Sequence, residues 1–189
     1  MGNGRSLFCV LLIYLCGSGC QPQGEVPALE NYEFGGDFEL LDQRGQPFAL
    51  QDLRGAAALL FFGYSFCPDI CPVTLSKLAQ VGELLGPGKR LKILFISVDP
   101  QRDTPRQLEE YLSYFDAGII GLTGREDDVQ AVISQYAGSY QRGEADEAGG
   151  YLISHPARTY LIDQQGRVRY LFSQEDTPER MAAIAGELF

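Results

Sequence analysis

Short apolar runs alternate with segments of helical periodicity along this chain, and this alternation constrains the fold more than any other feature. The apolar runs at residues 56–64 and 91–99 are short enough to be buried strands. Residues 73–85, 104–115 and 126–137 carry apolar side chains at helical spacing. Because strands that alternate with helices build a sheet covered on both faces, we expect an α/β protein with a central sheet flanked by helices.

The two ends of this domain are predicted to add antiparallel strands. Residues 38–50 resemble an opening hairpin with Arg44 and Gly45 at its turn, which gives the domain an N-terminal hairpin extension. A second hairpin over residues 158–172 makes the predicted sheet mixed rather than parallel, and a last helix follows from Thr177.

The first twenty residues have the layout of a secretion signal. Arg5 precedes the apolar run of residues 7–16, which is about half the length that a bilayer-spanning helix needs. Cys20 follows three small residues, which indicates a lipoprotein signal whose cysteine is acylated, although Gly17 stands where such signals usually have Leu. Cleavage without lipid and an uncleaved N-terminal anchor are the alternatives.

A short polar segment separates this leader from the domain. Residues 21–31 are broken by proline and glycine, so they are predicted to be a tether, and residues 32–189 form one domain. We therefore expect an exported protein, lipid-anchored through Cys20 at the periplasmic face of the inner membrane.

The charge of the chain argues against nucleic acid as a partner. The formal net charge is -10 at pH 7, whereas phosphate backbones are bound by clustered Lys and Arg. A solvated acidic surface explains this charge, and steering of a cationic partner or a metal ion is the alternative.

The distribution of the five cysteines leaves one dithiol in the domain. Three of them lie in the leader, so only Cys67 and Cys71 remain in the body of the protein. Outside the cytoplasm such a pair is a structural disulfide, a redox couple or a metal site. A structural disulfide would close a very small loop and would add little stability.

The position of this dithiol favours reactive thiols. Cys67 and Cys71 fall between a predicted strand and helix, and a spacing of four places two side chains on one face of a helix. Pro68 suits a first helical turn, where the helix dipole lowers thiol pKa values and favours thiolates. Two thiolates select Cu(I) or zinc, and the domain has too few cysteines for an iron–sulfur cluster.

His155 is the only histidine in the chain, so any metal here that is bound through an imidazole must use it. It follows Leu152 and Ile153, after a polar, glycine-containing segment at residues 138–150 that is predicted to be a surface loop or hairpin. An incidental surface histidine is the alternative interpretation.

Three ordered sequence blocks resemble the Sco/SenC family, the thioredoxin-fold assembly factors of cytochrome c oxidase. The resemblance covers about residues 32–189. The blocks are Cys67-Pro68-Asp69-Ile70-Cys71-Pro72, Ser97-Val98-Asp99-Pro100-Gln101-Arg102-Asp103-Thr104-Pro105, and Ser154-His155 with Thr159-Tyr160-Leu161-Ile162-Asp163.

The resemblance implies a thioredoxin-like fold and one copper ion bound by Cys67, Cys71 and His155. Cu(I) would be three-coordinate, and Cu(II) would take a further ligand. It also implies a metallochaperone rather than chiefly an enzyme. Such a chaperone takes copper from a periplasmic donor, delivers it to the binuclear copper centre of oxidase subunit II, and can keep the cysteines of that centre reduced.

Three other functions use parts of the same constellation. In a thiol–disulfide oxidoreductase Cys67 would attack and Cys71 would resolve the mixed disulfide, without need of His155. A peroxiredoxin-like peroxidase normally has Thr or Ser three residues before its reactive cysteine, where this chain has Tyr64. A zinc store would need another strong ligand.

Polar residues beside the dithiol have two interpretations each. Asp69 either orients the cysteines or meets a partner, or it is a carboxylate favoured at a helix start. The segment from Asp99 to Pro105 either borders the site or forms a turn in which Thr104 caps the next helix.

Overall fold

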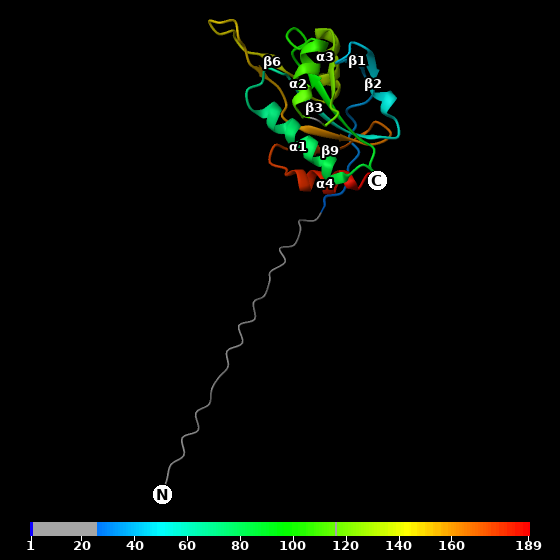
Figure 1. Ribbon diagram of the computed structural model, residues 1–189. Coiled ribbons are helices and arrows are strands. Elements are labelled where there is room, and N and C mark those ends of the chain that lie inside the picture. The colour runs from blue at the N-terminus through cyan, green and yellow to red at the C-terminus, as the bar shows by residue number, and fades with distance from the viewer. Residues whose placement is uncertain (2–25, 116) are drawn as a thin grey trace.

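A seven-stranded mixed sheet forms the centre of the protein. The computed structural model describes Met1 and residues 26–115 and 117–189 (Figure 1). The sheet order is β2-β1-β5-β4-β3-β8-β9, in which β3, β4 and β5 are parallel and the remaining pairs are antiparallel. The strands are β1 (Glu39–Asp42), β2 (Pro47–Ala49), β3 (Ala57–Gly63), β4 (Leu91–Ser97), β5 (Ile120–Thr123), β8 (Thr159–Ile162) and β9 (Val168–Phe172).

Helices cover both faces of this sheet, as the alternating pattern predicts. Their bounds are α1 (Ile70–Leu85), α2 (Pro105–Leu112), α3 (Glu126–Gln135) and α4 (Pro178–Gly186), with 3-10 turns η1 (Leu50–Leu53) and η2 (Ser113–Phe115). Apolar side chains of α1, α2 and α4 pack on one face of the sheet, and those of α3 pack on the other. Both described core clusters are built from residues between 29 and 188, so residues 26–189 contain both of them.

Both predicted hairpins are confirmed. At the first turn Gly45 has φ of +73°, and the Asp42 carboxylate accepts hydrogen bonds from the amides of Arg44 and Gln46, each at 2.8 Å. The segment at residues 138–150 contributes to a small separate hairpin, β6 (Gln141–Arg142) with β7 (Ile153–Ser154), whose connecting loop extends away from the domain (Figure 1).

The sequence pattern missed strand β5, which lies between α2 and α3 and supports β1. Gly118 and Gly121 interrupt its apolar run and weaken the strand signal. The glycine at 121 is required by packing, since a Cβ there would come within 2.4 Å of the Leu112 side chain on α2.

Residues 2–20 of the predicted leader and residues 21–25 of the tether lie outside the described residues. Within the described part of the tether, Leu29 packs on the core and the Glu30 amide donates to the Arg169 carbonyl at 2.9 Å. None of the helices in the described part of the chain is long and apolar enough to cross a membrane.

A single carboxylate organises the β8–β9 turn. Asp163 is buried and accepts hydrogen bonds from the amides of Gln165 and Arg167 and from the guanidinium groups of Arg167 and Arg169. Burial opposes ionisation, but these hydrogen bonds outweigh it and lower the pKa of Asp163 below its ordinary value.

We predict that Asp163→Asn lowers the free energy of unfolding by about 1–3 kcal/mol at pH 7, because the amide loses charge-assisted hydrogen bonds. A lowered native pKa contributes stability above the ordinary carboxylate pKa, and this contribution is lost as pH falls through the native pKa. The deficit should therefore shrink below about pH 4. Urea unfolding at pH 7 and at a pH below about 4 measures the deficit in unfolding free energy. Asp37→Asn, which changes the exposed Asp37–Arg54 pair, is the control. A deficit equal at both pH values would contradict this account.

Candidate metal centre

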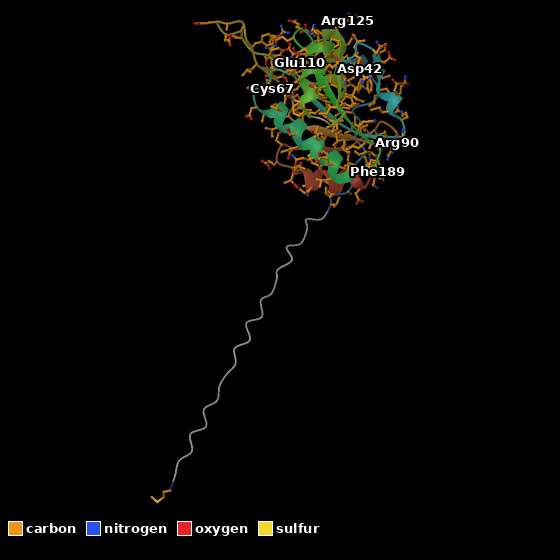
Figure 2. All side chains as sticks on the ribbon, in the orientation of Figure 1. Asp42, Cys67, Arg90, Glu110, Arg125 and Phe189 are labelled. Carbon is orange, nitrogen blue, oxygen red and sulfur yellow. The ribbon has the colours of Figure 1, made fainter. Side chains whose placement is uncertain are left out.

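The two cysteines lie on either side of the start of α1, at the carboxyl end of strand β3. Cys67 is in the turn before the helix and Cys71 is the second residue of the helix. The expected position at a strand-to-helix junction is confirmed, and Figure 2 places Cys67 at the edge of the domain. The expected stacking on one helical face is wrong, because α1 begins at Ile70 and Cys67 precedes it. The turn after β3, rather than helical spacing, brings the two thiols together.

Cys71 is fully buried against the end of β3. Its sulfur would lie 2.9 Å from a Cβ at Gly63, and that Cβ would also come within 2.6 Å of the Phe95 ring. Only glycine leaves room there for the sulfur. The Cys71 Sγ lies 3.9 Å from Nε2 of His155, so the structure brings together two side chains that are 84 positions apart.

His155 is held with Nε2 toward the sulfur. Its Nδ1 lies 3.1 Å from the Pro156 carbonyl, and the rings of Phe61 and Tyr64 pack edge-on against it, at centroid distances of 6.1 and 5.9 Å. Burial lowers the pKa of His155, although the contact with Pro156 opposes this shift. A neutral ring with Nδ1 against a carbonyl carries its proton on Nδ1, which leaves the Nε2 lone pair free to bind a metal.

The two thiols have opposite electrostatic environments. Cys67 is half-buried; burial raises the pKa of this thiol, but hydrogen bonds from the amides of Asp69, Cys71 and Ile70 outweigh burial and lower it. Burial raises the pKa of Cys71 well above its ordinary value, and the nearby Cys67 raises it further. The predicted lowering of the thiol pKa is therefore right for Cys67 and wrong for Cys71. Cys71 stands in the first turn of α1, but its side chain is buried in the core.

The three predicted ligands form an open arrangement in this structure. Both cysteines are free thiols. No group of three or more His, Cys, Asp or Glu side chains is arranged to hold a metal ion within residues 26–115 and 117–189. Two sulfurs and one imidazole nitrogen are nevertheless a soft donor set, which suits Cu(I).

The loop after β4 supports the turn between β3 and α1 that contains Cys67, which we call the cysteine turn. Asp103 is buried and accepts hydrogen bonds from the Ser65 amide at 3.0 Å and from the hydroxyl groups of Ser65 and Ser97. Thr104 caps α2 by accepting from the Gln107 amide at 3.3 Å, which confirms the predicted cap. The 99–105 segment thus both caps a helix and borders the site.

Tyr64 and Asp69 also lie near the site, and the role of Tyr64 was not predicted from the sequence. Tyr64 is buried, and its hydroxyl accepts a hydrogen bond from the Ile153 amide at 3.2 Å, two residues before His155. Its place in an apolar run marked it only as a core residue. Asp69 is exposed and stands at the N-cap of α1 without a side-chain capping bond.

We predict that Gly63→Ala lowers the free energy of unfolding by about 1–3 kcal/mol, because the added methyl group overpacks against Cys71 and Phe95. Denaturant unfolding of the metal-free protein measures the loss. Gly82→Ala on α1 is the matched control, since a Cβ there meets nothing within 4 Å and alanine favours the helix. Equal stability of the two variants would show that the close approach is not constraining.

Comparisons with known proteins identify the family of this chain. The sequence profile described as SCO1/SenC matches residues 26–188. An SCO2-like protein of Rickettsia felis is 40% identical over 155 residues, which cover 80% of this chain and 75% of that protein.

Solved structures share the same fold. The structure of Bradyrhizobium japonicum ScoI with copper bound has a TM-score of 0.76 at 37% identity, covering 82% of this chain and 99% of that one. Yeast Sco1 with copper bound has a TM-score of 0.76 at 34% identity, covering 82% and 87%. The predicted thioredoxin-like α/β fold is confirmed, and the chain belongs to the SCO1/SenC family.

Proposed function

We propose that this protein is a copper metallochaperone that binds one copper ion through Cys67, Cys71 and His155. The observation that carries the proposal is the 3.9 Å approach of His155 Nε2 to the Cys71 sulfur, beside a second thiol whose pKa is lowered. In this arrangement the Nε2 lone pair of a neutral imidazole and the Cys71 sulfur can bind the same metal ion. The copper named in the related ScoI and Sco1 structures supports the choice of metal.

The recipient is the binuclear copper centre of cytochrome c oxidase subunit II, and the event is ligand exchange rather than catalysis. Cys71 is fully buried, whereas Cys67 is partly exposed. An incoming ligand from the recipient reaches the copper beside Cys67. A periplasmic donor loads the site by the same route in reverse.

Export and anchoring place this chemistry beside the membrane-bound oxidase. The leader is a lipoprotein signal, Cys20 is the acylated residue, and the domain faces the periplasm from the inner membrane. Cleavage at the same position without a lipid would release the domain, so mass measurement of the processed N-terminus distinguishes the two.

A second candidate function is thiol–disulfide exchange on cysteines of the oxidase centre or of other exported proteins. The arrangement of an accessible Cys67 in front of a buried Cys71 favours it, because attacking and resolving thiols are usually divided in this way. In this role Cys67 attacks a substrate disulfide, one substrate sulfur leaves as a thiolate, and Cys71 then displaces the second. His155 is not needed for these steps.

Anaerobic copper titration of residues 26–189 tests the first proposal. We expect one copper per chain, loss of binding in Cys67→Ser and Cys71→Ser, and affinity at least about 10-fold weaker in His155→Ala. Ser76→Ala, at an exposed position on α1, is the control and should bind one copper. Affinity that is unchanged in His155→Ala would overturn the chaperone proposal and leave thiol exchange as the better account.

Alkylation tests how unequal the two thiols are. We expect iodoacetamide to modify Cys67 much faster than Cys71 at pH 7, because Cys67 is accessible and has the lower pKa. As the pH is raised, the alkylation rate at Cys67 should reach its plateau at a pH below the ordinary thiol pKa of about 8.5. Peptide mapping by mass spectrometry measures both rates, and similar rates for the two thiols would contradict the arrangement described.

A further inference from the structure

Arg102 lies between the segments that supply the proposed ligands. Its guanidinium stacks 3.6 Å from the ring centroid of Tyr151, on the segment that leads to His155. It also lies 4.7 Å from the ring of Phe66, which is next to Cys67. One side chain on the β4–α2 loop thus contacts both the cysteine turn and residues 151–155, which we call the histidine segment.

A buried carboxylate fixes both partners of this stack. Asp99 is fully buried, pairs with Arg102 Nε, and accepts a hydrogen bond of 2.8 Å from the Tyr151 hydroxyl. A buried carboxylate is costly without such partners, so the three groups favour one arrangement. Arg102 Nη2 is buried and has no hydrogen-bond partner in the described structure. Its position is therefore determined by the aromatic faces as well as by Asp99.

The histidine segment needs an anchor of this kind. Strands β6 and β7 contain two residues each, and an isolated two-stranded hairpin is marginally stable at best. Apart from the short hairpin pairing, the Tyr151 hydroxyl and the Ile153 amide give this segment hydrogen bonds to the main domain, through Asp99 and Tyr64. Tyr151 is four residues before His155, close enough for its position to fix that of the imidazole.

We infer that Arg102, together with Asp99 and Tyr151, is a clamp that positions His155 against the thiols. Arg102 is a positioning residue, because it acts on the metal through His155 and not as a ligand. The inference rests on the proposed copper function. The clamp makes the histidine a preorganised ligand, so its loss should cost affinity in the same way as loss of the histidine itself.

A double-mutant cycle on residues 26–189 tests this inference. We expect Arg102→Ala to weaken copper binding about 10-fold or more, and to have no further effect in the His155→Ala background. Arg102→Lys keeps the charge but loses the planar stack, so we expect it to weaken binding as well. Tyr151→Phe keeps the ring and removes only the hydroxyl bond to Asp99, so its loss should be smaller. Arg106→Ala, an exposed arginine on α2, is the matched control and should bind as the wild type does.

Hydrogen exchange in the metal-free protein provides a readout independent of copper. We expect faster exchange at the Ile153 amide in Arg102→Ala than in the wild type, with the amides of β3 unchanged. That result would support the clamp even if the wild type failed to bind copper, a failure that would overturn the proposed function. Affinity in Arg102→Ala equal to that of Arg106→Ala would overturn the inference alone. Additive losses from Arg102→Ala and His155→Ala would overturn it too.

Discussion

The contact between the Cys71 sulfur and the end of strand β3 is the one on which the metal centre depends. β3 is an interior strand of the sheet, parallel to β4 and antiparallel to β8, and its last residue, Gly63, is paired with Ser97 of β4. Gly63 has no side chain, and the sulfur occupies the space that one would fill. One proposed ligand therefore belongs to the rigid core, and the other two are brought to it by loops.

The unequal burial of Cys67 and Cys71 gives their thiols different pKa values. The same packing that fixes Cys71 excludes water from it and raises its pKa, whereas the helix amides stabilise the thiolate of Cys67. Binding of a cation reverses the situation at Cys71, because a thiolate bound to metal no longer needs water as its partner. In the proposed copper site, the buried sulfur of Cys71 would be a thiolate mainly when the metal is bound, while Cys67 would be a thiolate more readily without it. Such an order suits reversible exchange through the exposed side.

The sequence predicted the fold of this protein better than the geometry of the candidate site. Cysteine spacing, the single histidine and the strand–helix alternation are local or compositional signals. They predicted the fold, and they singled out Cys71 and His155, which the structure brings together. The start of α1 at Ile70 was missed, although Asp69, a residue type favoured at helix N-caps, stands immediately before it; its side chain makes no capping bond. The raised pKa of Cys71 and the roles of Gly63 and Tyr64 depend on tertiary packing, which a strand-like apolar run cannot specify.

The proposed ligands come from distant parts of the chain, and the segments that carry them differ in how firmly they are held. The cysteines are joined by one short turn, but His155 is carried by a hairpin with two residues in each strand. Segments with few backbone hydrogen bonds open at low free-energy cost, whereas the core under Cys71 opens only when the domain unfolds. The affinity of the centre can thus be changed by moving the histidine segment, without disturbing the buried sulfur. A carrier that must hold copper firmly and then release it needs this division between a fixed ligand and a displaceable one.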